Sequence, residues 1–290
     1  HPNIIHYIGL LQHHHRLAIV TEDFNGKPLA ECIPEQGFPI GTFLDIALQV
    51  VNALIEIHSQ HVIHKDINPY NIVYNAQKRL AKIIDFGMAS KHSQESPVHM
   101  KTMLLGGNLP YVAPEQTGRL NRVIDHRTDF YGLGITLYKM LCGQLPFNSA
   151  DPLELVHAHL TQTAPRISAW RKDIPPLFDD ILEKLLAKQT EDRYQCAKGI
   201  KHDLEKCLEQ WQTAQQFETF EIGSYDRNEQ FAIPQTLYGR DKEISRLTDA
   251  FETANTGLTE LVLVNGFSGM GKTSLVNEVR KPLINRRGYF

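Results

Sequence analysis

Apolar positions recur at helical spacing through much of the chain. One helix is marked by apolar residues that lie three or four positions apart: Phe43, Ala47, Val50, Leu54 and Ile57. Such spacing places the residues on one face of a helix. The same pattern predicts helices from Asp129 onward and around residues 181–186, and the helical region is expected to end near Trp211.

Short apolar runs predict strands between these helices. The runs cover residues 17–21, 62–63, 72–74 and 80–84, and each is bounded by polar or turn-forming residues. The last two runs flank the turn 75–79 and predict a hairpin. Asp66 and Asn71 lie in the polar loop before this hairpin and Asp85 follows it. We therefore expect the hairpin to aim these three side chains at one point.

The C-terminal part of the chain has a different pattern. Residues 212–235 are polar, mixed in charge and weakly periodic, which favours a linker between domains. An apolar run over 261–264 predicts a strand, and Leu275, Val276 and Val279 predict a helix after it. This organisation predicts a first domain to residue 211 and a second domain over 236–290.

Composition narrows the function classes. The 290 residues are 42% hydrophobic, carry a formal net charge of -3 and have a pI near 6.6. The chain therefore has no overall basic field for nucleic acid or an anionic membrane surface. No apolar run approaches the roughly 20 residues that span a bilayer. The four cysteines lie far apart without a C-x-x-C pair, so we expect a reducing, cytoplasmic location.

Motifs spaced along the first domain have a specific combined pattern. They are His64-Lys65-Asp66-Ile67-Asn68-Pro69-Tyr70-Asn71, Asp85-Phe86-Gly87, Ala113-Pro114-Glu115, the Asp129 segment and the Arg193 segment. In this order they resemble the eukaryotic-type protein kinases. The resemblance implies an α+β protein-kinase-like fold with a mainly helical C-lobe over 28–211. Residues 1–27 would be the hinge and the remnant of an N-lobe that we expect to be truncated.

The resemblance also implies a phosphotransfer site that uses ATP and Mg²⁺. Asp66 would be the catalytic base, and Asn71 and Asp85 would supply the hard oxygen ligands that magnesium prefers. The adenine pocket would be formed by four residues: Thr21, Glu22, Phe24 and Val73. An ordinary strand end remains an alternative for Thr21.

Further residues match supporting positions of the family. Glu115 and Arg193 would form the buried ion pair that ties the activation segment to the helical lobe. Asp129 would hold the backbone of the catalytic loop. The other matching motif positions are His64, Lys65, Phe86 and Gly87. Lys65 stands where the family has arginine, and its ammonium group lacks the bidentate fork of a guanidinium.

Two departures keep an alternative open. Asn68 replaces a lysine that contacts the transferring phosphate in the family, and Asn108 replaces a threonine that follows Gly107. Loss of a fixed cation beside developing charge commonly slows catalysis by orders of magnitude. A pseudokinase-like binding module therefore remains an alternative to an active kinase.

A second phosphate-binding motif lies between the run 261–264 and the helix after it. The sequence from Gly266 to Thr273 fits G-x-x-x-x-G-K-[ST], with glycines at 266, 269 and 271. Gly266, Gly269 and Gly271 would let the backbone wrap phosphates, Lys272 would reach the terminal phosphates and Thr273 would bind magnesium.

The Tyr-Gly-Arg segment 238–240 resembles AAA-type ATPases, and the whole arrangement resembles large bacterial hybrid kinases that are common in cyanobacteria. This resemblance implies Ser/Thr protein substrates, together with a GAF sensor and a histidine kinase further along a longer chain. Residues 236–290 would be the start of an α/β P-loop NTPase domain of the AAA type, which is expected to be truncated. The ATPase as the main activity, regulated by the kinase lobe, is the third hypothesis.

Overall fold

The computed structural model describes residues 1–14, 16–91, 108–119, 122–214, 217–227, 237, 239–267 and 269–278. The strands are β1 (Tyr7–His13), β2 (Arg16–Thr21), β3 (Lys27–Pro28), β4 (Ile72–Asn75) and β5 (Leu80–Ile83). The α-helices of the first part are α1 (Leu29–Cys32), α2 (Ile40–Ser59), α4 (Arg127–Cys142), α5 (Pro152–Thr161), α6 (Pro176–Leu185) and α7 (Ala197–Ala214). The α-helices of the second part are α8 (Asp241–Asn255) and α9 (Lys272–Glu278). Short 3-10 helices are η1 (Leu109–Tyr111), η2 (Pro114–Thr117) and η3 (Ile167–Ala169).

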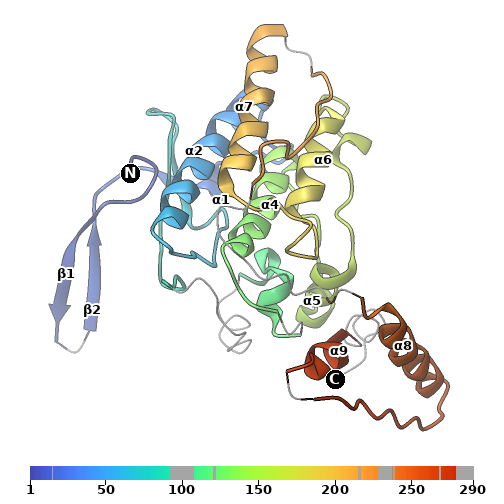
Figure 1. Cartoon of the computed structure of the whole chain (residues 1–290). Coiled ribbons are helices and arrows are strands. Elements are labelled where there is room, and N and C mark those ends of the chain that lie inside the picture. Colours follow the sequence, from blue (N-terminus) through green and yellow to red (C-terminus); the bar gives the residue numbers. More distant parts are fainter. Residues whose placement is uncertain are drawn as a thin grey trace.

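The core lies between four helices that run side by side in Figure 1. Helix α2 packs against α7, α4 and β5, and α4 also packs against α6. The apolar stripe expected on α2 is buried there, and the ring of Phe43 meets that of Phe178 edge-on at 5.5 Å. Helix α2 is also the one described helix that is long and apolar enough to cross a membrane. Its contacts on several sides are those of a core helix in a globular domain.

Two small sheets flank this helical body. Strands β3, β4 and β5 form one antiparallel sheet, in which Ile72 pairs with Ile83. Strands β1 and β2 form a separate hairpin that projects from the body in Figure 1. Apolar residues of this hairpin are exposed, for example Leu17 at 66% and Ile19 at 71%. These elements confirm a mainly helical lobe accompanied by small sheets.

Several local predictions differ from the structure. The expected strand at 62–63 is only an isolated bridge between Ile63 and Ser90. The strand predicted at 261–264 is wrong, because these residues are extended but pair with no described strand. Helix α9 follows as expected, although Val279 lies outside the described residues.

The described parts of the segment 212–235, residues 212–214 and 217–227, are more ordered than its composition indicates, and its other residues lie outside the described chain. Helix α7 continues to Ala214, and residues 217–227 turn back along the lobe. Three of their apolar side chains, Phe217, Phe220 and Ile222, pack against the main core. This stretch is therefore part of the packed lobe.

Candidate active site

Asp129, in the first turn of α4, holds the backbone at the start of the loop 64–71. One carboxylate oxygen of Asp129 accepts the His64 N–H at 3.0 Å and the other accepts the Lys65 N–H at 2.7 Å. The ring of His58 on α2 also contacts this carboxylate at 2.8 Å. Burial alone would raise the pKa of the Asp129 carboxyl, but His58, His64 and these hydrogen bonds hold the pKa below its usual range.

Asp66 is surrounded by three amide side chains. Asn68 Nδ2 donates to Oδ1 at 2.8 Å and Asn71 Nδ2 donates to Oδ2 at 2.7 Å. Asn108 Nδ2 lies 2.8 and 2.6 Å from the two oxygens. The structure thus brings together Asp66, Asn68 and Asn71, and it adds Asn108 from a segment some forty residues away. Every one of these donors is neutral.

The backbone brings the segment of Asp85 next to Asn71, because the Ile84 N–H donates to the Asn71 carbonyl at 2.9 Å. Because Asn71 Nδ2 also donates to the Asp66 carbonyl at 3.0 Å, the opposite end of this amide presents its oxygen. Asp85 is exposed and has a φ of +59°. Its Oδ1 accepts the Gly87 N–H at 3.0 Å, and the ring of the next residue, Phe86, meets that of His64 at 4.8 Å.

The side-chain oxygens of Asn71 and Asp85 are candidate ligands for a magnesium ion. No group of three His, Cys, Asp or Glu residues among the described positions could hold a metal by itself. Mg²⁺ in phosphotransfer sites is commonly held by one or two protein oxygens together with substrate phosphates and waters. An exposed Asp85 carboxylate and the Asn71 amide oxygen fit that kind of ligand set.

The expected hinge follows β2. Thr21 is its last residue and pairs with Tyr7. The Glu22 carboxylate accepts the ammonium of Lys82 at 2.6 Å and the His6 N–H at 2.8 Å. The pKa of Glu22 is lowered chiefly by the Lys82 hydrogen bond. Sequence patterns gave no sign of Lys82, because its partner is sixty residues away.

The other two predicted pocket residues lie close together. Phe24 is 7% exposed, so its ring belongs to the core. Its carbonyl accepts from Asn75 Nδ2 at 3.3 Å. Val73 lies in β4 and its Cγ1 closely faces Gly26, where an added Cβ would come within 2.7 Å. Within the described chain, the Glu22 carbonyl and the Phe24 N–H make no hydrogen bond and remain available to a base.

Glu115 and Arg193, expected to pair, form a bidentate ion pair with N–O distances of 2.7 and 2.9 Å. Both side chains are 0% exposed. Thr128 donates to the same carboxylate at 2.8 Å, and the Arg193 Nε–H donates to the Ala187 carbonyl at 2.7 Å. Such full pairing is what a buried charge requires. The pair joins η2 to the loop before α7.

A buried polar cluster beside this pair was missed by sequence reasoning. Lys188 donates to the Tyr131 hydroxyl at 3.2 Å, and that hydroxyl lies 3.0 Å from His159 Nδ1. The ammonium group also lies 4.6 Å from the ring centroid of Phe147. Burial and the charge of Arg193 lower the pKa of Lys188 to about 7. Burial and Lys188 lower the pKa of His159 to about 3.

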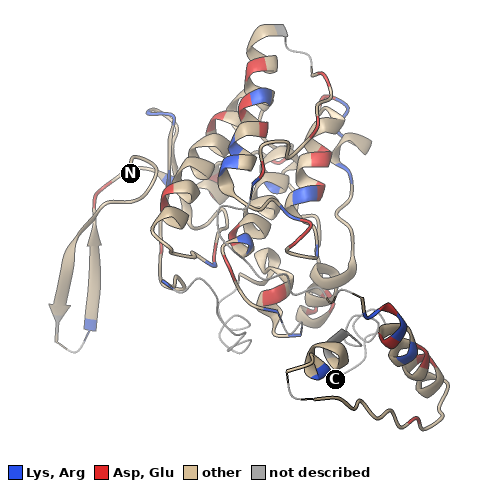
Figure 2. Cartoon of the chain, viewed as in Figure 1, with Lys and Arg blue, Asp and Glu red and all other residues tan. Residues whose placement is uncertain are grey.

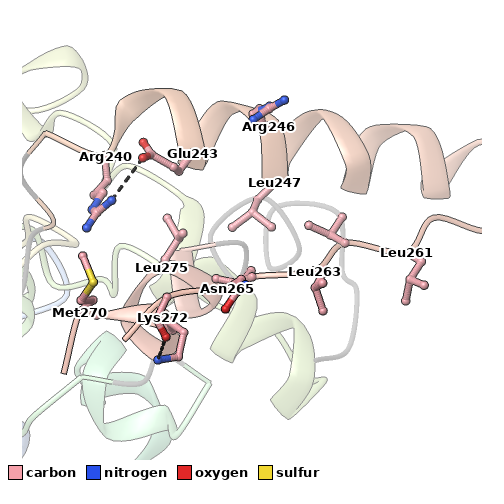
Figure 3. Close-up of a pocket in the computed structure, with 14 residues that line it drawn as sticks. Arg240, Glu243, Arg246, Leu247, Leu261, Leu263, Asn265, Met270, Lys272 and Leu275 are labelled. Atoms are coloured by element: carbon pink, nitrogen blue, oxygen red, sulfur yellow. Dashed lines mark hydrogen bonds and ion pairs between the residues drawn. The ribbon is translucent and has the colours of Figure 1, made fainter. Parts of the chain in front are cut away.

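The second predicted phosphate site lies in the separate C-terminal part. A cavity of about 540 Å³ lies between α8, the stretch 261–266 and α9, and Figure 3 shows residues that line it. The Lys272 ammonium donates to the carbonyls of Gly266 and Phe267 at 2.9 and 2.8 Å. Thr273 is exposed at the start of α9.

The loop of this second site bends at two of its three motif glycines. Gly269 and Gly271 have φ values of +81° and +78°, which favour glycine. Ser268 lies outside the described residues. The lysine is therefore on the inner side of a loop that glycines allow to bend.

Charges of both signs are interspersed over the described residues in Figure 2. The helical body carries its acidic and basic side chains in mixed order, and the β1–β2 hairpin carries few. The electrostatic features of functional interest are therefore local, at the two predicted phosphate sites.

A mainly helical lobe with a carboxylate-bearing loop, a hinge and an ion-paired segment is the architecture of a protein-kinase-type domain. Residues 1–204 match the family model for the protein kinase domain, and residues 236–290 match that for the AAA ATPase domain. The chain belongs to the protein kinase family, with an AAA ATPase region following its kinase domain.

The curated proteins to which the chain is similar include signalling kinases. Hybrid signal transduction histidine kinase G of Dictyostelium discoideum is 28% identical over 344 residues, which cover 89% of this chain and 10% of that protein. A "probable serine/threonine-protein kinase" of Clostridium perfringens is 32% identical over 71% of this chain and 29% of its own length. Serine/threonine-protein kinase PrkC of Bacillus subtilis is 29% identical over 72% and 32%, respectively. The chain thus spans between a tenth and a third of these relatives.

Proposed function

We propose that the protein containing this chain is a serine/threonine kinase that transfers the γ-phosphoryl group of ATP to protein hydroxyls. The observation that carries this proposal is the Asp66 carboxylate, which accepts hydrogen bonds from Asn68 and Asn71 in a loop whose backbone is held by Asp129. Family membership and the names of the bacterial relatives support the same reaction.

In this proposal Asp66 orients the acceptor hydroxyl and takes its proton as the oxygen–phosphorus bond forms. The bond from the γ-phosphorus to the bridging oxygen breaks, and ADP leaves with that electron pair. Asn71 and Asp85 would hold magnesium, which would neutralise charge on the phosphates when Mg-ATP is bound. Thr21, Glu22, Phe24 and Val73 line the adenine site.

We further propose that residues 236–290 begin a nucleotide-binding regulatory domain. Lys272 and Thr273 would contact phosphate and magnesium there, and the AAA ATPase match supports this role. The relative from Dictyostelium motivates the proposal that a sensor and a histidine kinase act further along the full protein. The cytoplasm is the proposed location, because the four cysteines, all within the described residues, form no disulfide.

A pseudokinase-like module is the second candidate function. The two carboxylate oxygens of Asp66 accept hydrogen bonds from three neutral amides. At position 68, where the family has its lysine, this chain has an uncharged asparagine. Under this candidate the lobe binds nucleotide or a partner, and the P-loop region acts as the switch.

Phosphotransfer in the full-length protein separates the two candidates. Asp66→Asn and Asp85→Asn should each abolish magnesium-dependent autophosphorylation, because one removes the base and the other a metal ligand. Asp180→Asn is the matched control, since Asp180 is a partly exposed carboxylate on α6 paired with Arg166. Activity in Asp66→Asn equal to wild type, or no activity in wild type, would contradict the enzyme proposal.

A further inference from the structure

Residues 217–227, which we call the strap, follow α7 and precede the ATPase region. The ring of Phe217 stacks on that of Trp211 at 6.1 Å and meets Phe178 edge-on at 5.3 Å. The Gly223 N–H donates to the buried carboxylate of Asp203 at 2.7 Å. These contacts attach the start and the middle of the strap to α6 and α7.

Asp226 makes the most specific contact of the strap. Its side chain is only 3% exposed. The carboxylate accepts the Gln195 N–H at 2.8 and 2.9 Å and the Cys196 N–H at 3.0 Å, directly before α7 begins. Lys184 approaches it to 3.6 Å. A buried carboxylate in a polar segment is costly unless it is paired in this way.

Gly199 leaves the room that this contact needs. A Cβ at Gly199 would lie 2.7 Å from Asp226 Oδ1 and 2.9 Å from its Cα. The carboxylate therefore lies directly against the first turn of α7, where the helix dipole also favours a negative charge.

One set of contacts leads from Gln195 to the catalytic loop. The Gln195 carbonyl accepts from His126 Nε2 at 2.9 Å. The His126 ring packs edge-on against that of His58 at 5.5 Å, and His58 contacts Asp129 at 2.8 Å. Asp129 in turn holds the first two amides of the loop that carries Asp66.

A second set leads from the same residue to the activation segment. Gln195 Nε2 donates to the Arg193 carbonyl at 2.7 Å, and Gln195 Oε1 accepts from Arg127 at 2.9 Å. Arg193 forms the buried pair with Glu115. One glutamine thus joins both supports of the candidate site, and Asp226 fixes the backbone of that glutamine.

We propose that Asp226 of the strap is a positioning residue for phosphotransfer, because it fixes the backbone of Gln195, which contacts both supports of the candidate site. The strap is the segment through which the two domains are joined, so a change that pulls it from α7 releases Gln195. The inference rests on the proposed kinase function, because the loop that it positions carries the proposed base.

Asp226→Ala in the full-length protein tests the proposal, with Glu221→Ala as the control because Glu221 is an exposed carboxylate of the same strap. Gly199→Ala pushes the carboxylate away without removing it. Asp226→Asn keeps an acceptor and should give an intermediate effect. We expect Asp226→Ala and Gly199→Ala to lower kcat about two- to thirtyfold, the range typical of side-chain networks.

Hydrogen exchange provides a readout that does not require activity. In both disruptive variants, peptides over 61–71 and 194–200 should exchange faster than in wild type, while core peptides of α2 over 44–56 should not change. Faster exchange at 194–200 alone, or an equal increase everywhere, would overturn the proposal. If wild type transfers no phosphate, the kinase proposal fails while the exchange pattern still decides whether Asp226 positions the loop.

Discussion

Lys188 gives the molecule a pH-dependent stability that can be worked out from its surroundings. Its ammonium group faces the Tyr131 hydroxyl and the rings of Tyr131 and Phe147. No carboxylate among the described residues forms an ion pair with it. Burial, followed by the charge of Arg193, therefore lowers its pKa from 10.5 to about 7. We predict that Lys188→Met removes a rise in stability between neutral and alkaline pH.

The sign follows from proton binding in the two states. The unfolded chain keeps the Lys188 proton up to its ordinary pKa, whereas the folded chain releases it near pH 7. Between these values the unfolded state binds more protons, so the free energy of unfolding increases with pH. One proton contributes at most about 1.4 kcal/mol per pH unit. From pH 7 to 9 the contribution of Lys188 should thus be about 1 to 3 kcal/mol.

Urea denaturation at pH 7, 8 and 9 measures this contribution as the difference between wild type and variant. As pH rises, the free energy of unfolding of wild type should increase relative to that of Lys188→Met. Lys172→Met is the control, because Lys172 is exposed and its difference from wild type should stay constant. A difference for Lys188→Met that is also independent of pH would refute the assignment of Lys188 as a buried, weakly basic amine.

Other predictions concern the ion pair and the two phosphate sites. Glu115→Gln leaves the buried Arg193 charge unpaired and should lower the free energy of unfolding by about 3–5 kcal/mol; a loss below about 1 kcal/mol by urea denaturation would contradict the pairing argument. Lys272→Ala should weaken ATP binding about 10- to 150-fold, the loss of one charged hydrogen bond, and a nucleotide titration in an Asp85→Asn background isolates that site. Asn68→Lys should destabilise the loop by about 1–3 kcal/mol, because the Tyr70 N–H loses its acceptor; faster phosphotransfer by this variant would instead show that the missing cation limits catalysis.

Local sequence patterns predicted which helices and strands the lobe contains better than they predicted where these elements end. The apolar spacing on α2 and the hairpin of β4 and β5 follow from periodicities that burial imposes on neighbouring residues. The order of residues 217–227 could not be predicted in this way, because it depends on contacts with α6 and α7. Composition described Asp226 as a polar linker residue, although its side chain is 3% exposed. The run 261–264 had the composition of a strand, but a strand also needs a hydrogen-bonded partner.

In the candidate site too, local motifs identified some residues, whereas residues that act through contacts between distant positions were missed. Motifs identified Asp66, Asn71 and Asp85, and a local loop brings the first two together. Spacing could not reveal that Asn108 contacts both oxygens of Asp66, since the two residues lie 42 positions apart. His58 was missed for a related reason. It is one of several polar residues on a mainly apolar helix, and only the structure shows that its ring contacts the Asp129 carboxylate.

Asn68 explains why the replacement of a lysine is more than the loss of a charge. Its Oδ1 accepts the N–H groups of Tyr70 and Asn71 at 2.9 and 3.1 Å, while its Nδ2 donates to the Asp66 carboxylate at 2.8 Å. An ammonium group donates but cannot accept, so a lysine at this position would leave the Tyr70 N–H without this partner, while the Asn71 N–H would keep the carbonyl of residue 68 at 3.1 Å. The amide therefore holds the loop in shape and orients the proposed base at the same time. Because Asn108 also donates to that base, the two replacements act on one carboxylate and should be read together, as a site organised by amides.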